Sequence, residues 1–124
     1  MPEFSFVLLY VESPPASVDF YSRLLGHAPV ETTPTFAMLP LRDGVMLGLW
    51  SRATVEPAAA VSTAGASEIA FTVADAKAVD AAHADWAKRG LKIAQAPTQM
   101  DFGRTFVALD PDGHRLRVFA PGAA

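Results

Sequence analysis

Residues 107–119 read VALDPDGHRLRVF and contain the pattern that decides the fold. Short apolar strands lie on both sides of a Pro-Asp-Gly turn, which is the usual composition of a β-hairpin. In the second strand Arg115 and Arg117 share one face, whereas Leu116 and Val118 share the other. The stretch therefore predicts a strand with one apolar face and one face that presents arginine.

The order of elements that leads to this hairpin occurs twice in the chain. In the second half the strand EIAFTVAD precedes a helix that Asp75 caps and Gly90 ends. In the first half the strand FVLLYVES precedes a helix that Ser13 caps and Gly26 ends. Three strand patterns follow each helix: PVET, TFAMLPL and VMLGLW in the first half, and LKIAQAP, GRTFVALD and HRLRVFA in the second.

This repetition predicts an α+β fold in which strand, helix and three strands form a βαβββ unit that occurs twice. We expect a single domain over 1–124, with unit one at 4–51, a linker at 52–66 and unit two at 67–120. The mixed sheets of the two units are expected to form an open, incompletely closed barrel-like cleft with the helices outside.

Composition narrows the function classes. The chain has 124 residues, of which 51% are hydrophobic and 19% are charged, as in a globular domain. A net charge of −3 argues against a nucleic-acid surface, and the absence of cysteine excludes disulfides and thiolate metal sites. The run FSFVLLYV is too short to span a membrane and lacks a basic segment before it, so we expect a cytoplasmic protein.

Strand alternation divides the side chains between two faces. The mainly aliphatic set belongs under the helices and contains Val7, Leu9, Val11, Val45, Leu47, Leu49, Ile69, Phe71, Val73, Leu116, Val118 and Ala120. The opposite set is aromatic, small and sparsely charged, and predicts the lining of a cavity. It contains Phe6, Leu8, Tyr10, Met46, Gly48, Trp50, Glu68, Ala70, Thr72, Arg115, Arg117 and Phe119.

The paired units, the helix end VDFYSRLLG and the hairpin DPDGHRLRV resemble the vicinal oxygen chelate superfamily. That superfamily includes glyoxalase I, extradiol dioxygenases and the bleomycin- and fosfomycin-resistance proteins. The resemblance implies that metal ligands would fall at Phe6, Gly48, Glu68 and Arg117. Phenylalanine and glycine offer no donor atom and arginine is a permanent cation, so we expect no metal, no other cofactor and no catalytic residue of that kind.

Glu68 and Arg117 are expected to form an ion pair where relatives hold a metal, since a charge on an apolar face is costly without a partner. Two interpretations remain open and are compatible. The pair is purely structural, or it also anchors a polar or carboxylate group of a ligand, for which the planar fork of arginine is suited.

The chain resembles one branch of the superfamily more than the rest, in the stretches LLYVESPPASVDFY, TPTFAMLP, LGLWS, SEIAFTV and DPDGHRLRV. That branch confers resistance to phenazine-type antibiotics by binding them. It implies a homodimer whose clefts hold flat ring systems. Phe36 and Trp50 match aromatic positions of that branch, although Trp50 also suits a core or a dimer interface. We expect Gly48 to leave room for a ring. Further candidate ligand-binding residues are Phe6, Met38 and Phe102, together with Glu68 and Arg117, and Met38 equally suits a gap filler in the core.

The leading hypothesis is a metal-free binding protein that sequesters a planar aromatic compound, such as a phenazine-type antibiotic, and so confers resistance. One alternative is a glyoxalase- or dioxygenase-like enzyme, a lyase or oxidoreductase. Another is a subunit without a ligand, whose inward aromatic residues pack a dimer. His83 and Trp86, three residues apart on the second helix, are interpreted as packing residues.

Overall fold

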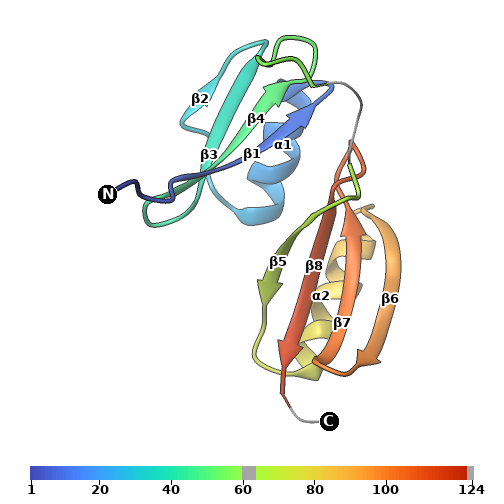
Figure 1. Cartoon of the computed structure of the whole chain (residues 1–124). Helices are drawn as coiled ribbons and strands as arrows, with labels where there is room; N and C mark the ends of the chain where they lie inside the picture. Colours follow the sequence, from blue (N-terminus) through green and yellow to red (C-terminus); the bar gives the residue numbers. More distant parts are fainter. Residues whose placement is uncertain (60–63, 123–124) are drawn as a thin grey trace. The chain divides into compact units, whose positions relative to one another are not determined.

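The computed structural model describes residues 1–59 and 64–122 and contains the predicted order of elements twice (Figure 1). The elements of the first half are β1 (Phe6–Val11), α1 (Pro14–Leu25), β2 (Glu31–Thr32), β3 (Phe36–Arg42) and β4 (Val45–Ser51). The elements of the second half are β5 (Glu68–Thr72), α2 (Ala76–Lys88), β6 (Lys92–Met100), β7 (Gly103–Leu109) and β8 (Arg115–Pro121).

Both helices begin and end at the residues that the sequence indicates. The Ser13 hydroxyl accepts a hydrogen bond from the Ala16 N–H at 3.2 Å at the start of α1. The Asp75 carboxylate does the same for the Ala78 N–H at 2.8 Å at the start of α2. Gly26 ends α1 with φ 71°, in the left-handed region that favours glycine. The predicted helix limits are confirmed, with Arg89 as the C-cap of α2.

Each half forms a four-stranded mixed sheet with one helix against one face. The strand orders are β1-β4-β3-β2 and β5-β8-β7-β6, in which the first and last strands of each half pair in parallel and the other pairs are antiparallel. The predicted α+β fold with two βαβββ units and sheets that do not close is confirmed. The cleft that both sheets would line together stays a prediction.

The hairpin at 107–119 is held by one carboxylate. Asp110 is 5% exposed, and its Oδ1 accepts hydrogen bonds from the N–H groups of Asp112 and His114, both at 2.9 Å. The Asp110 N–H in turn donates to the His114 carbonyl at 3.0 Å. These bonds satisfy the backbone of the turn and explain why DPDG closes it with Gly113 at φ 93°.

Burial confirms which face of each sheet packs under its helix. Leu47 and Leu49 of β4 are fully buried, as are Leu116 and Val118 of β8. In the second half the core comprises Val79, Phe106, Ala108, Val118 and Ala120, with Phe71, Val73, Ala82, Trp86, Leu91 and Ile93 packed against it. The opposite faces keep partly exposed side chains, as the alternation predicts.

Strand β6 runs three residues beyond Pro97, at which the sequence pattern ends it. It is the edge strand of its sheet, where a missing N–H need not remove a ladder bond. The register of β6 against β7 also shifts between Ile93 and Gln95 and again between Gln95 and Thr98. The strand is therefore irregular where it passes the candidate site.

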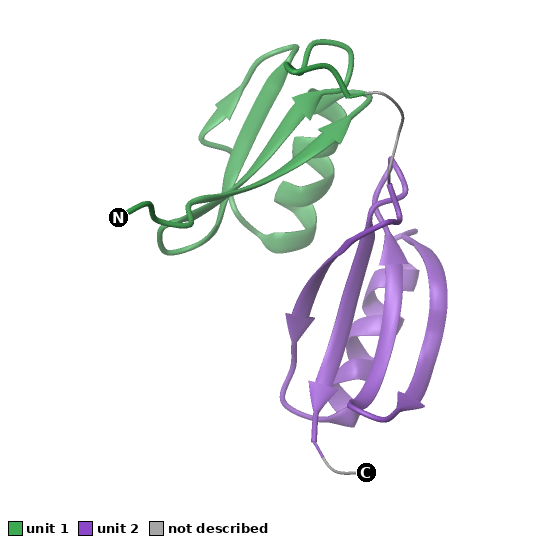
Figure 2. Ribbon diagram, in the orientation of Figure 1, with its two compact units in different colours: residues 1–62 green, residues 63–124 purple. Residues whose placement is uncertain are grey.

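The chain divides into unit 1, residues 1–62, and unit 2, residues 63–124 (Figure 2). Part of the predicted linker packs on unit 1, since Val55 is buried and its N–H donates to the Ser51 carbonyl at 3.0 Å. Residues 60–63 of that linker lie outside the described residues, and its bounds stay a prediction. Among the described residues, no helix has the length and apolar character needed to cross a bilayer.

Candidate functional site

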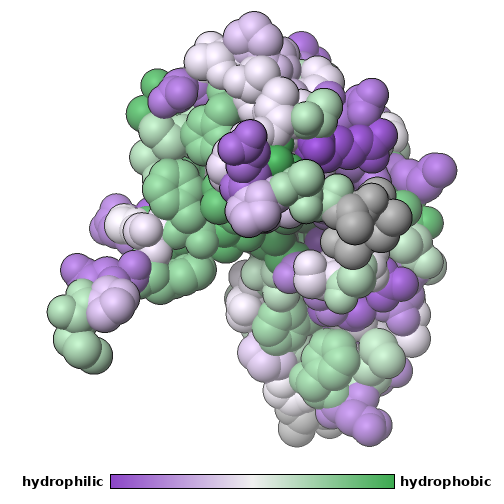
Figure 3. Space-filling view, turned by 45° about the horizontal axis from the view of Figure 1, so that its top comes forward, coloured by the Kyte–Doolittle hydropathy of each residue, from purple (hydrophilic) through white to green (hydrophobic). Residues whose placement is uncertain are grey.

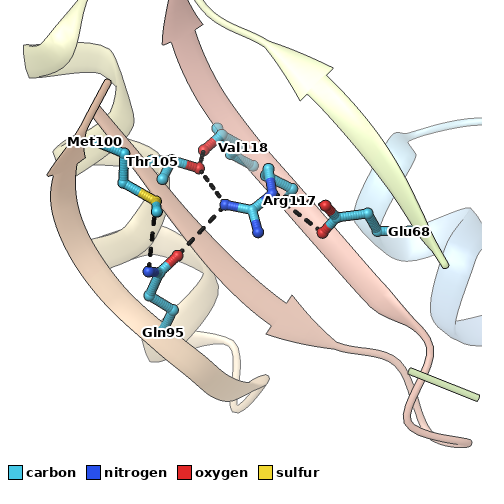
Figure 4. A network of polar contacts seen from close by, with 6 residues as sticks. All are labelled: Glu68, Gln95, Met100, Thr105, Arg117 and Val118. Atoms are coloured by element: carbon cyan, nitrogen blue, oxygen red, sulfur yellow. Dashed lines mark hydrogen bonds and ion pairs between the residues drawn. The ribbon is translucent and has the colours of Figure 1, made fainter. Parts of the chain in front are cut away.

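The predicted ion pair between Arg117 and Glu68 is present on the open face of the unit 2 sheet (Figure 4). The Arg117 Nε donates to both carboxylate oxygens of Glu68, at 2.9 and 3.1 Å. Glu68 lies level with Arg115 in the parallel pair of β5 and β8, so Arg117 is its diagonal neighbour. The side chains are 18% exposed for Arg117 and 34% exposed for Glu68, so the pair is only partly screened by water.

Two further residues complete a network that the sequence did not indicate. The Arg117 Nη1 donates to the Thr105 hydroxyl at 3.1 Å and to the Gln95 amide oxygen at 3.4 Å. Thr105 is fully buried, and its hydroxyl donates to the Val118 carbonyl at 2.9 Å. Figure 4 shows Thr105 and Gln95 on one side of the Arg117 guanidinium and Glu68 on the other. Arg117 is therefore fixed by three strands, β5, β7 and β6, around its own strand β8.

Aromatic rings lie beside this network in unit 2. The Phe102 and Phe119 rings meet edge to face, with centroids 5.9 Å apart. The Arg117 guanidinium carbon lies 5.9 Å from the Phe102 centroid, within the range of a cation–π contact. Phe102 is 44% exposed, so one side of its ring is open to solvent. Three of the predicted residues, Glu68, Phe102 and Arg117, are thus brought together, with Phe119 as an addition.

The open face of the unit 1 sheet is apolar. Phe6, Leu8 and Tyr10 of β1 are 39%, 44% and 42% exposed. They alternate along one face of the strand, and hydrophobic surface gathers over unit 1 in the space-filling view (Figure 3). A large contiguous apolar patch on a protein surface often marks a binding site.

Cross-strand partners extend this patch. Phe36 and Trp50 are directly paired between β3 and β4, and their rings meet edge to face with centroids 6.1 Å apart. Met38 pairs with Gly48 in the same ladder and is half-buried. All five predicted residues of the first half (Phe6, Phe36, Met38, Gly48 and Trp50) therefore lie on this face.

The expectation that Gly48 leaves room for a ring stays a prediction, because side-chain ends now cover the glycine. A Cβ atom built at Gly48 would lie 2.5 Å from the Leu8 Cδ2 and 3.2 Å from the Phe36 Cζ. Leu8 and Gly48 are level in the parallel pair of β1 and β4, so the leucine side chain folds over the glycine. The glycine allows this close packing, and the atom that covers it is the end of a leucine side chain that is 44% exposed.

Replacing Gly48 with alanine is expected to lower the free energy of unfolding by about 1 kcal/mol, because the overpacking outweighs the backbone gain from removing glycine. Leu8→Ala removes the nearer obstacle, so the Gly48→Ala, Leu8→Ala double variant should be more stable than the two single effects add up to, by about 1 kcal/mol. Urea unfolding of the four proteins measures this coupling. Strict additivity would contradict the packing of Leu8 on Gly48.

The four positions that the resemblance assigns to metal ligands are structurally equivalent in pairs. Glu68 and Arg117 are diagonal neighbours in unit 2, and Phe6 and Gly48 occupy the same diagonal in unit 1. The donor set does not fit a metal, because the first pair is a closed ion pair and the second offers no donor atom. Within 1–59 and 64–122 no group of three or more His, Cys, Asp or Glu side chains is placed to hold an ion.

The histidine and tryptophan of the second helix have a packing role, as the sequence predicts. The His83 and Trp86 rings contact Phe106 edge to face, with centroids 5.3 and 5.4 Å away. Trp86 also contacts Phe71 at 6.1 Å. Both side chains therefore belong to the interface between α2 and its sheet, on the side opposite to Arg117.

The two βαβββ units, each with one sheet face not covered by its helix, place the chain in a known class of protein. The glyoxalase/bleomycin resistance protein/dioxygenase superfamily matches residues 3–118, and the chain belongs to it. The chain is 32% identical to the phenazine antibiotic resistance protein EhpR of Enterobacter agglomerans, over 90% of this chain and 86% of that protein. The predicted family resemblance is confirmed.

Solved structures agree with this assignment. A protein of Agrobacterium tumefaciens, determined by NMR in solution, is 50% identical with a TM-score of 0.87, over 99% of this chain and 100% of that chain. A glyoxalase/bleomycin resistance protein/dioxygenase from Nocardioides is 25% identical with a TM-score of 0.82, over 98% of this chain and 84% of that chain. The α+β fold is thus shared by experimentally determined relatives.

Proposed function

We propose that this protein binds a planar aromatic molecule of the phenazine type and holds it without chemical change, so that the compound is sequestered and resistance follows. The observation that carries the proposal is the row of exposed Phe6, Leu8 and Tyr10 beside the Phe36–Trp50 pair. Flat rings bury apolar surface on such a face and stack against its aromatic edges. The ligand-binding residues proposed are Phe6, Phe36, Met38, Gly48, Trp50, Glu68, Phe102 and Arg117.

The similarity to EhpR supports the same function. That relative is a phenazine antibiotic resistance protein, and 90% of this chain aligns with it. Binding without chemistry is favoured because the positions expected to hold a metal present a phenyl ring, a glycine and an ion pair. Gly48 contributes by letting Leu8 and Phe36 pack closely over the sheet.

Apolar burial sets the scale of the affinity. Burying about 300 Å² of apolar surface is worth roughly 7 kcal/mol, and stacking adds about 1–3 kcal/mol. The loss of translational and rotational freedom removes at least about 4 kcal/mol. The remainder of about 4–6 kcal/mol corresponds to a Kd from roughly a millimolar to tens of micromolar. Polar anchoring at Arg117 is what would tighten it further.

Titration with phenazines is expected to quench tryptophan fluorescence through Trp50. Trp86 serves as the matched control, because it packs between Phe71 and Phe106 on the helix side of its sheet. Quenching should therefore persist in Trp86→Phe and disappear in Trp50→Phe. Isothermal calorimetry on the wild-type protein gives an independent reading. The absence of binding heat and of quenching with every planar aromatic compound tried would refute the proposal.

The homodimer that the resemblance implies, and the cytoplasmic location expected from composition, belong to this proposal. Exposed apolar surface on β1 is compatible with either a ligand or a second copy of the chain as its cover. The fluorescence titration distinguishes a bound ligand from a second copy of the chain. If only a second copy covers β1, added phenazine should not change the fluorescence of Trp50.

A further inference from the structure

The open face of the unit 1 sheet has a glycine at its centre. Gly48 pairs with Leu8 of β1 on one side and with Met38 of β3 on the other. Met46 and Trp50 lie two positions away along β4 and share its face. All four neighbours carry large apolar side chains, whereas the glycine carries none. The surface of the sheet is therefore lowest at Gly48.

Two side-chain ends cover this low point. A Cβ atom built at Gly48 would lie 2.5 Å from the Leu8 Cδ2, 3.2 Å from the Phe36 Cζ and 3.4 Å from the Phe36 Cε1. Gly48 is consequently buried, although its neighbours on this face are at least partly exposed. One leucine and one phenyl ring thus shield the backbone of β4 at this point.

The two covering side chains differ in their freedom to move. Phe36 is half-buried on an inner strand, its ring contacts Trp50 edge to face, and its N–H donates to the Thr33 hydroxyl at 3.0 Å. Leu8 is 44% exposed and lies on β1, which among the described residues has a strand on one side only. An exposed side chain changes between staggered rotamers in picoseconds to nanoseconds. Leu8 is therefore the movable cover and Phe36 the fixed one.

Turning Leu8 outward would uncover a flat apolar surface. Carbon atoms of a ring could then approach the backbone of Gly48 to about 3.5–4.0 Å, an approach that only glycine permits. The rings of Phe36 and Trp50 would bound the ligand on one side and Leu8 on the other. A ring in this position buries more apolar surface than one that lies on top of the leucine.

We infer that Leu8 is a gate over Gly48: a planar aromatic ligand turns the leucine side chain outward and lies directly on the glycine backbone, against the Phe36 ring. The inference rests on the proposed function and names the residue that controls access to its site. The ligand shifts the rotamer of Leu8 because it binds only the open form.

Nuclear Overhauser contacts in the wild-type chain test the gate without any variant. Unsubstituted phenazine bound to the full chain should show contacts from its ring protons to the Gly48 Hα protons, which Leu8 covers in the ligand-free form. Contacts to the Leu8 methyl groups without any to the Gly48 Hα protons would overturn the gate, because the ligand would then lie on top of a leucine that has not moved.

Calorimetric titration of two variants with phenazine gives a second test. Leu8→Ala should lower the Kd by about threefold, because the closed form no longer competes with the ligand. Adding Gly48→Ala to Leu8→Ala should then raise the Kd by about tenfold, because the new methyl group occupies the place of the ring. Weaker binding in Leu8→Ala, or no further loss in the double variant, would overturn the gate.

Leu9→Ala is the matched control, because Leu9 is the same residue type on the same strand but faces the helix side, level with the buried Leu49. It should leave the Kd unchanged, and an equal gain in affinity there would overturn the gate. Absence of phenazine binding in the wild type and in Leu8→Ala overturns the proposed function and the gate with it. Binding without the contact to Gly48 overturns the gate alone.

Discussion

Replacing Phe106 with alanine is expected to lower the free energy of unfolding of unit 2 by about 3–5 kcal/mol, the range for deleting a fully buried phenyl ring. Phe106 is 0% exposed and lies at the centre of the unit 2 core. Its ring is the common neighbour of His83 and Trp86, so alanine leaves a cavity between α2 and β7 that neither ring can fill without moving.

Phe102→Ala is the informative comparison for this prediction. Phe102 lies just before the same strand, is 44% exposed and faces Arg117 instead of the core. Its loss should cost less than about 1 kcal/mol of stability. Under the proposed function it should nevertheless weaken phenazine binding. Urea unfolding followed by circular dichroism measures the stabilities, and similar costs for the two variants would contradict the separation of core and binding face.

Replacing Gly103 with alanine is expected to destabilise unit 2 by about 3–5 kcal/mol, from backbone strain and overpacking together. Gly103 has φ 135°, a region that side-chain-bearing residues rarely adopt, and it pairs with Pro121 at the end of the β7–β8 ladder. A Cβ atom there would collide with the Ala120 carbonyl oxygen, and the Ala120 carbonyl carbon would be 3.1 Å away. Both obstacles are backbone and cannot rotate aside.

Gly90→Ala separates the two contributions. Gly90 also has a positive φ, 90°, but nothing lies within 4 Å of a Cβ built on it. Its substitution should therefore cost only about 1 kcal/mol, for strain alone. Thermal unfolding of the two variants gives the difference. Equal losses would show that the contact with Ala120 is relieved by movement of β8.

Most of the fold could be predicted because its signals are local. Ser13 and Asp75 mark helix starts, and glycines mark turns and helix ends. Strict alternation separates Leu116 from Arg117 without any knowledge of tertiary structure. The ion pair with Glu68 followed from the same alternation plus a family resemblance that placed both residues at one former metal position.

The parts that could not be predicted depend on register and packing. Gln95 reaches Arg117 because β6 shifts its register on both sides of it, and an irregular strand breaks the alternation rule. Thr105 could have been found by counting the ladder back from the Pro-Asp-Gly turn, which sets it opposite Phe119. Leu8 covers Gly48 through side-chain packing, on which a sequence pattern says nothing.

The parallel pairing of first and last strands has a consequence for how the chain is made. β1 finds its hydrogen-bonding partner only when β4 exists, so the apolar row of Phe6, Leu8 and Tyr10 stays unpaired until residue 51 has been synthesised. Once residue 51 has been synthesised, all four strands of the unit 1 sheet are present, although unit 2 has not yet been translated. Synthesis on the ribosome therefore allows unit 1 to complete its sheet before unit 2 has been made.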